Sequence, residues 1–183
     1  MKAKKISPPL FIISIFVMVI ICGTLLLMLP FSTKSGITLI DALFTETSAV
    51  CVTGLIIKNT GQDFTIFGQV IILLSIQLGG LGIMTIATFF YQIIKKDLTL
   101  KRQLVIKELV AKSDFYDISN LIVKVILYTF VFEFFGTIFF AISFIPKFGF
   151  GKGLFYSVFH SVSSFCNAGF SNFVDSFAQY YNS

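Results

Sequence analysis

Three long apolar runs limit what this chain can fold into. Residues 10–29 and 64–94 contain no charged side chain, and residues 118–145 contain two, Lys124 and Glu133. A run of about 18 or more apolar residues is typical of a membrane span, because about 20 residues of α-helix cross a hydrocarbon core of about 30 Å. Only 13% of all residues are charged, against about 25% in an ordinary soluble domain. The sequence therefore predicts an all-α membrane protein with three spans through the lipid bilayer.

The first of these runs could instead be a secretory signal. A signal peptide has an apolar region of about 7–15 residues and a cleavage site made of small residues, whereas this run is longer and lacks such a site. Lipoprotein attachment at Cys22 is also disfavoured, because bulky Ile21 precedes it. We therefore expect a retained first span, preceded by the basic residues Lys2, Lys4 and Lys5.

Metal, nucleic-acid and enzymatic functions find no support in the composition. The chain has three cysteines, Cys22, Cys51 and Cys166, and one histidine, His160, whereas a zinc site needs about four ligands, usually in close pairs. The net charge of +5 comes without the interleaved basic and aromatic residues of a nucleic-acid surface, and no group of residues forms a catalytic pattern. We expect no nucleic-acid partner and no enzymatic activity. A Cys51–Cys166 disulfide stays open as an alternative that we do not favour.

A short segment between the first two apolar runs returns later in the chain. Residues 44–55 read Phe-Thr-Glu-Thr-Ser-Ala-Val-Cys-Val-Thr-Gly-Leu, and residues 159–170 read Phe-His-Ser-Val-Ser-Ser-Phe-Cys-Asn-Ala-Gly-Phe. The first is small and rich in hydroxyl groups, and it carries an acid, Glu46. When the two are superposed, four positions are identical: Phe44 with Phe159, Ser48 with Ser163, Cys51 with Cys166, and Gly54 with Gly169.

Each copy is too short to cross a bilayer, and the first predicts a re-entrant loop. Thr38 or Asp41 would cap a short helix that runs toward Ala49; the chain would then turn near Val50 and return as extended backbone through Gly54. Non-helical backbone inside a membrane is costly unless it is buried in protein or lines water. Uncharged loops of small residues suit a cation filter, in which backbone carbonyls replace the hydration shell of the ion. The alternative for each loop alone is an ordinary extracellular loop that dips into a helix bundle.

Three other features each leave two interpretations open. Gly79, Gly80 and Gly82 allow either close helix packing, which we favour, or a bend. Glu133 lies at mid-depth of the third span, where it either makes a structural hydrogen bond, which we favour, or binds an ion directly. The polar segment 95–117 has an apolar side, and it either lies at the membrane surface or docks a cytoplasmic partner.

The basic residues predict how the chain is oriented. The N-terminus carries three of them and the 95–117 segment six, whereas residues 31–63 carry Lys34 and Lys58. Segments rich in lysine and arginine stay in the cytoplasm. We therefore expect a multi-pass protein of the plasma membrane with a cytoplasmic N-terminus and a cytoplasmic 95–117 segment. Both re-entrant loops would face the outside, and Pro146 would end the third span.

Three stretches of this sequence resemble the Trk/Ktr/HKT superfamily of potassium uptake proteins, and most of all its Ktr membrane subunits. They are Ser-Ala-Val-Cys-Val-Thr-Gly-Leu at 48–55, Gln-Leu-Gly-Gly-Leu-Gly-Ile-Met-Thr at 77–85, and the second loop at 159–170. The resemblance covers nearly the whole chain. It implies four span–re-entrant pore loop–span repeats around one pore, with one filter loop in each repeat.

The resemblance also implies the site, the ion and the partners. The filter glycines would be Gly54 and Gly169, and the ion-facing carbonyls would come from the residues before them: Val50, Cys51, Val52 and Thr53 in the first loop, and Phe165, Cys166, Asn167 and Ala168 in the second. Such proteins take up K⁺ through the filter backbone, some with Na⁺ dependence, and need no cofactor. They often form homodimers with a cytoplasmic nucleotide-binding regulatory subunit, which the 95–117 segment would face.

The same resemblance divides the chain into three parts. Residues 1–94 would form the first repeat, 95–117 an amphipathic cytoplasmic linker, and 118–183 an incomplete second repeat of span and pore loop, so that about one and a half of four repeats are present. Two of four filter loops cannot surround an ion. We therefore expect a truncated N-terminal portion of a transporter, or else two copies that pair to supply four loops. The alternative is a non-conducting membrane scaffold or assembly fragment that binds a cytoplasmic regulator.

Overall fold

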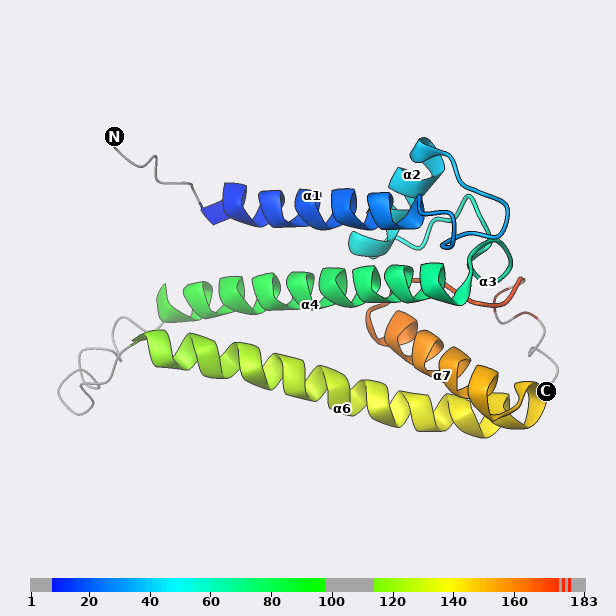
Figure 1. The fold of residues 1–183 in the computed structure, drawn as a ribbon. Coiled ribbons are helices and arrows are strands. Elements are labelled where there is room, and N and C mark those ends of the chain that lie inside the picture. The colour runs from blue at the N-terminus through cyan, green and yellow to red at the C-terminus, as the bar shows by residue number, and fades with distance from the viewer. Residues whose placement is uncertain (1–7, 98–113, 175, 177, 179–183) are drawn as a thin grey trace. The chain divides into compact units, whose positions relative to one another are not determined.

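The structure is a computed structural model that describes residues 8–97, 114–174, 176 and 178. Its regular elements are helices (Figure 1), in chain order α1 (Pro8–Leu27), α2 (Leu39–Val50), α3 (Thr60–Asp63), α4 (Ile66–Asp97), α6 (Asp114–Phe148) and α7 (Phe150–Phe165). Over the described residues the one extended pairing is an isolated antiparallel bridge between Thr33 and Phe64. The predicted all-α class is confirmed.

The three longest helices, α1, α4 and α6, fall on the three predicted spans. Among the described residues, Val123–Phe148 is the one segment long and apolar enough to cross a membrane by itself, and Ile13–Leu27 and Ile66–Gly82 form shorter apolar helices. Most of the predicted 95–117 linker lies outside the described residues, so its amphipathic helix stays a prediction.

The chain divides into two compact units. One combines residues 1–80 with residues 133–183, and the other is residues 81–132. Within the first unit, α1 lies beside the first part of α4, and α7 lies beside the last part of α6 (Figure 1). Both predicted re-entrant loops therefore belong to the same unit.

Pro146 does not end the third span as expected. The helix α6 continues through it to Phe148, and the amide of Gly149 still donates to the carbonyl of Ile145 at 3.0 Å. Proline lacks an amide hydrogen and so removes one helical hydrogen bond, a loss that is tolerated in the last turn. The chain then reverses at Gly149, whose φ of 79° lies in the left-handed region that glycine adopts without strain.

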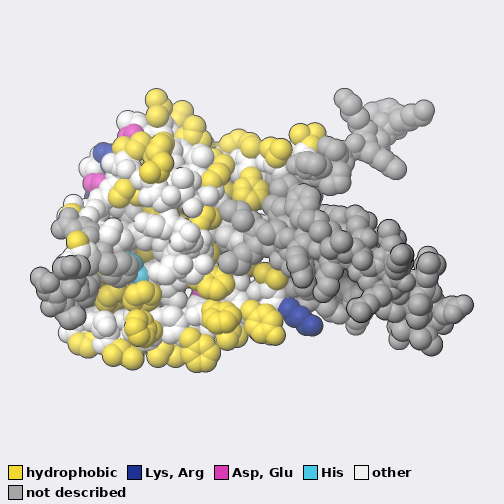
Figure 2. Space-filling view, turned by 180° about the vertical axis from the view of Figure 1, so that it is seen from behind, with side chains coloured by type: hydrophobic (Ala, Val, Ile, Leu, Met, Phe, Trp, Pro, Cys, Tyr) yellow, Lys and Arg dark blue, Asp and Glu magenta, His cyan; other side chains and the backbone are white. Residues whose placement is uncertain are grey.

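The core of the first unit gathers around α2, α7 and the first part of α4. Buried apolar residues of these helices form one cluster with residues from the adjoining segments: Leu27, Ala42, Ala49, Phe64, Ile71, Ile72, Ile76, Phe159, Val162, Cys166, Ala168 and Phe170. Hydrophobic side chains also cover much of the described surface in Figure 2, and on α6 Phe139 and Ile142 are 73% and 71% exposed. Such exposed apolar surface suits a helix that faces lipid or neighbouring spans.

Thr38 defines the start of α2. Its hydroxyl oxygen accepts a hydrogen bond from the amide of Asp41 at 3.2 Å, which makes Thr38 the N-cap of the two candidates. Asp41 then lies in the first turn, where its carboxylate is close to the positive end of the helix dipole. By contrast, the N-cap residue of α7 is Gly149, which has no side chain to cap the helix.

Candidate functional site

Both short helices, α2 and α7, end in the same hydrogen-bond pattern. In the first loop the amides of Cys51, Val52 and Thr53 donate to the carbonyls of Thr47, Ala49 and Ser48, at 2.9, 3.1 and 2.8 Å. In the second loop the amides of Cys166, Asn167 and Ala168 donate to the carbonyls of Val162, Ser164 and Ser163, at 2.9, 3.0 and 2.7 Å. Each bond of the first loop has its counterpart in the second loop, in the same alignment that superposes the four identical residues of the two segments.

The backbone beyond each helix also repeats. Val52 and Asn167 have positive φ, 56° and 58°, and so do Gly54 and Gly169, 81° and 74°, whereas the residue between each pair does not. The two loops therefore share one pattern of backbone dihedrals, with a left-handed residue on each side of Thr53 and of Ala168. A left-handed conformation costs an L-residue about 1–2 kcal/mol, and it is least suited to a β-branched residue such as Val52. Tertiary contacts therefore hold this residue in place.

The two loops meet at their glycines. A Cβ placed on Gly54 would lie 2.7 Å from the carbonyl oxygen of Ala168 and 3.2 Å from the Cα of Gly169, and one placed on Gly169 would lie 3.3 Å from the Cα of Gly54. Ordinary non-bonded contacts are longer, about 3.5–4.0 Å, so a side chain at either position would force its neighbours apart. The fold thus brings together the two residues that the sequence singles out as filter glycines.

Two adjacent glycines of α4 support the two loops. Gly79 lies against the carbonyl of Val50 at the end of α2, and a Cβ on Gly80 would lie 2.5 Å from the Sγ of Cys166. Small residues allow helix backbones to approach this closely, so Gly79 and Gly80 show the close packing that we favoured over a bend. The Val50 carbonyl, one of those predicted to face an ion, lies against α4.

The predicted site residues differ in how open they are to solvent. Cys51, Thr53, Asn167 and Gly169 are exposed, Val52, Gly54 and Phe165 are half-buried, and Val50, Cys166 and Ala168 are buried. Both Cys51 and Cys166 are free thiols, so no disulfide joins them. Burial, helped by nearby Glu133, raises the pKa of the Cys166 thiol to about 12, and this thiol therefore stays protonated at neutral pH.

A buried acid lies one turn before the end of α2. Glu46 has no exposed surface. Its Oε2 accepts a hydrogen bond from the Ser75 hydroxyl of α4 at 2.6 Å, whereas its Oε1 has no hydrogen-bond partner among the described residues. Sequence reasoning noted this acid but gave it no role, although an acid among small residues in a membrane segment is itself a signal.

Glu133 is enclosed between helices. It is 6% exposed, the Gln77 side chain of α4 approaches its carboxyl group, and its backbone carbonyl accepts a hydrogen bond from the Ser161 hydroxyl of α7 at 2.7 Å. Oε1 of Glu133 and Nε2 of Gln77 lack a hydrogen bond of good geometry. These contacts are of the kind that a structural role, the interpretation we favoured, would produce.

His160 connects α7 to the segment that follows the second loop. Its Nδ1 lies 2.8 Å from the carbonyl oxygen of Tyr156 and its Nε2 lies 3.0 Å from the Ser171 hydroxyl. A carbonyl can only accept, so Nδ1 carries the hydrogen and Nε2 accepts from Ser171. Burial lowers the pKa of His160, which favours this neutral ring. The ring also stacks on Phe173, with 4.7 Å between the centroids, and thereby fixes residues 171–173 to α7.

One serine distinguishes the two loops. The Ser163 hydroxyl donates to the carbonyl of Phe170 at 2.7 Å and ties the chain just past Gly169 back to α7. Ser48 occupies the same place in the first loop, but within the described part of the chain its buried hydroxyl has no hydrogen-bond partner. The two loops therefore share a backbone conformation but not the same bracing.

The groups near the two loops that could bind a cation are backbone carbonyls and hydroxyl groups. Beside the second loop lies a hollow of about 300 Å³ lined by His160, Ser163, Ser164, Asn167, Gly169, Phe170, Ser171 and Ser176. Within the described ranges, no group of three or more histidine, cysteine or acidic side chains is arranged to hold a metal ion. Backbone carbonyls and hydroxyl groups are thus the ligands that the loops offer to a cation.

Known proteins match nearly the whole chain. The family model described as TrkH, cation transport protein, matches residues 8–183. Potassium/sodium uptake protein NtpJ of Enterococcus hirae is 41% identical over 175 residues, which cover 94% of this chain and 39% of that protein. Ktr system potassium uptake protein B is 38% identical in Bacillus subtilis, over 98% of this chain and 40% of that protein, and 37% identical in Vibrio alginolyticus, over 99% and 40%. The chain therefore spans about two fifths of the length of these relatives.

These matches confirm both the resemblance carried by the loop motifs and the prediction of a membrane protein. They extend over α1, α4 and α6 as well as the two loops. The chain belongs to the TrkH family of cation transport proteins.

Proposed function

We propose that this chain contributes to potassium uptake across the plasma membrane, through a selectivity filter lined by backbone carbonyls. The observation that carries the proposal is the meeting of Gly54 and Gly169 between two loops of matching backbone conformation. The relatives support the same cargo, because their names describe potassium and potassium/sodium uptake proteins. None of these names is that of an enzyme, in keeping with the expectation that this chain is not one.

The physical chemistry of the loops suits a monovalent cation. Both α2 and α7 end at the loops, so the negative ends of two helix dipoles lie at the site. Residues 51–55 and 166–170 contain no charged side chain. An ion would then be held by partial charges alone, which lets it bind and also leave, as conduction requires.

We assign the ion-facing carbonyls to residues 50–53 and 165–168, which precede the filter glycines Gly54 and Gly169, as expected from the sequence. Val50 and Phe165 are the last residues of their helices, and the Val50 carbonyl lies against Gly79. These two carbonyls therefore stand at the edge of the set. The residues that follow them have the alternating φ angles and form its centre.

Orientation, repeats and partners complete the proposal. We place the N-terminus and the 95–117 segment in the cytoplasm and both loops on the outside, with residues 1–94 and 118–183 as parts of two span–pore loop–span repeats. We also expect a homodimer and a cytoplasmic nucleotide-binding subunit that contacts the 95–117 segment. Support for a multi-component assembly comes from relatives named as proteins of a Ktr system. Na⁺ dependence is included because one relative is named for both ions.

Replacement of Gly54 by serine in the intact transporter tests the filter. The new side chain would meet the Ala168 carbonyl and stand at a φ of 81°, so the preference for K⁺ over Na⁺ should fall by about tenfold, the factor that corresponds to 1.4 kcal/mol. Gly36 is the matched control, because its φ is 79° and nothing lies within 4 Å of its Cβ position. Gly36→Ser should bear similar backbone strain and keep the preference.

Uptake of both ions in bacterial cells that lack their own potassium uptake measures each variant. Unchanged selectivity in Gly54→Ser would sink the filter assignment and favour the non-conducting scaffold. The scaffold predicts instead that scrambling residues 100–110 abolishes partner binding, while both loop glycines tolerate substitution. Expression of this chain by itself in the same cells tests whether paired copies complete a pore.

A further inference from the structure

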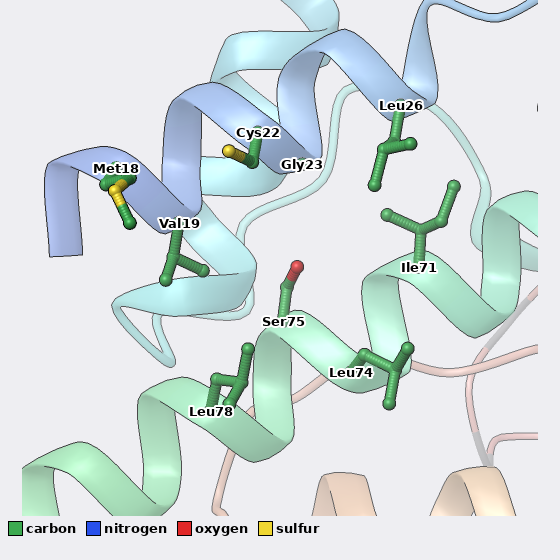
Figure 3. A pocket seen from close by; sticks show the side chains of 9 residues that line it. All are labelled: Met18, Val19, Cys22, Gly23, Leu26, Ile71, Leu74, Ser75 and Leu78. Atoms are coloured by element: carbon green, nitrogen blue, oxygen red, sulfur yellow. The ribbon is translucent and has the colours of Figure 1, made fainter. Parts of the chain in front are cut away.

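A buried carboxyl group stands among three helices, and the proposed filter does not use it. Glu46 of α2 accepts the hydrogen bond from Ser75 of α4, and Gly23 of α1 lies so close to this carboxyl group that a Cβ there would require the carboxyl group to move. Figure 3 shows the Ser75 hydroxyl pointing from α4 toward α1, where Gly23 lies. The groove between α1 and α4, about 240 Å³, is lined by apolar side chains apart from Ser75 and Cys22. Ser75 is therefore the polar anchor that this surrounding offers to Glu46.

This hydrogen bond is followed by a second close contact between α2 and α4. Val50 follows Glu46 by one helical turn, Gly79 follows Ser75 by one turn, and the Val50 carbonyl lies against Gly79. Residues four apart share one face of a helix, so the two pairs are consecutive steps of the same helix–helix contact. Val50 is the last residue of α2. The contact therefore ends where the first filter loop begins.

The second re-entrant helix is held at the matching place. Ser161 of α7 corresponds to Glu46 of α2 in the register of the two segments, and its hydroxyl donates to the Glu133 carbonyl at 2.7 Å. Gly136 of α6 lies against Ser161, as Gly23 of α1 lies against Glu46. Each re-entrant helix thus has a glycine of the preceding long helix at this position and a side-chain hydrogen bond to a long helix. The recurrence indicates that the position serves the loop that follows.

We propose that Glu46 is a positioning residue, whose hydrogen bond with Ser75 fixes the register of α2 on α4 and thereby the place of the first loop's carbonyls. This inference rests on the proposed function. The positioning of α2 depends on this hydrogen bond and not on a negative charge of Glu46. Ser75 is the polar partner described for the carboxyl group, and no cation is paired with it among the described residues. A glutamine would keep the bond, since its amide can present either a carbonyl or an N–H to Ser75.

Four variants of the intact transporter test the inference: Ser75→Ala, Glu46→Leu, Glu46→Gln, and Ser75→Ala combined with Glu46→Leu. Ser14→Ala is the matched control, because Ser14 lies exposed on α1 and bonds within its own helix. Uptake of K⁺ and Na⁺ is compared at equal amounts of protein in the membrane. We expect Ser75→Ala and Glu46→Leu to lower the preference for K⁺ by about fivefold, the factor for one hydrogen bond of ordinary strength. Glu46→Gln and Ser14→Ala should stay within about twofold of the wild type.

The double variant adds a further condition. Because the two side chains form one contact, it should be no less selective than the poorer single variant. Wild-type selectivity in Ser75→Ala, or a loss in Glu46→Gln as large as that in Glu46→Leu, would overturn the positioning role. If Glu46→Leu fails to reach the membrane, Ser75→Ala decides alone. A wild type without K⁺ uptake overturns both proposals, whereas a selectivity loss in Gly54→Ser beside a normal Ser75→Ala overturns this inference alone.

Discussion

A methyl group on Gly79 of α4 should displace the end of α2, and with it the first filter loop. A Cβ at this position would lie 2.7 Å from the carbonyl carbon of Val50 and 3.0 Å from its Cα. Contacts between carbon atoms are about 3.5–4.0 Å, so the end of α2 would have to move by roughly 1 Å. Overpacking costs about 1–3 kcal/mol, and a backbone cannot rotate away as a side chain can. Alanine gains about 1 kcal/mol over glycine within a helix, so the net destabilisation by Gly79→Ala should be up to about 2 kcal/mol.

Gly151→Ala is the matched control, and it should change the stability in the opposite direction. Gly151 lies in α7, and a Cβ there meets nothing within 4 Å, so the gain in helix propensity, up to about 1 kcal/mol, acts alone. Thermal unfolding of the purified transporter in detergent should give a lower midpoint for Gly79→Ala and a higher midpoint for Gly151→Ala. The preference for K⁺ over Na⁺ should fall in the first variant and persist in the second. A Gly79→Ala transporter with wild-type stability and selectivity would refute the reasoning.

His160 should make the folded protein sensitive to acid, because burial lowers its pKa from 6.5. Its contribution to stability is therefore complete above about pH 6.5 and is lost as the pH falls through the lowered pKa. Between about pH 7.5 and about pH 5, the thermal midpoint should therefore fall less steeply in His160→Gln than in the wild type, and equal slopes would contradict this. Thr38→Ala removes the N-cap of α2 and should cost about 1 kcal/mol. Hydrogen exchange of the first α2 amides should become faster, and wild-type exchange rates would mean that the cap contributes little.

Local patterns predicted the helices, because each pattern has a direct physical reading. The apolar runs indicated α1, α4 and α6, and Thr38 and Asp41 were the two candidates for the start of α2, of which the structure shows Thr38 as the N-cap. The register of the repeated segment also paired Gly54 with Gly169, which the fold then brings into contact. In these cases the interactions within one segment and those of the whole fold favour the same structure.

Sequence reasoning failed where contacts between distant segments decide the structure. The left-handed φ of Val52 runs against the preference of a β-branched residue, so its own neighbours in sequence could not predict it. The bond between Glu46 and Ser75 joins two helices across 29 positions, and no local pattern encodes such a pair. Pro146 was expected to stop a helix. Because it lies in the last turn of α6, the loss of one helical hydrogen bond does not end the helix there.

The unequal bracing by Ser163 and Ser48 has a mechanical consequence. The bond from Ser163 to Phe170 joins the chain before Gly169 to the chain after it, whereas the hydroxyl of Ser48 makes no such bond to any residue that the structure describes. An ion that advances along a filter changes its coordination at each step, and the surrounding backbone must yield slightly to follow it. We expect the first loop to supply this compliance. The filter would then combine one more rigid loop and one more flexible loop, both built from the same repeated segment.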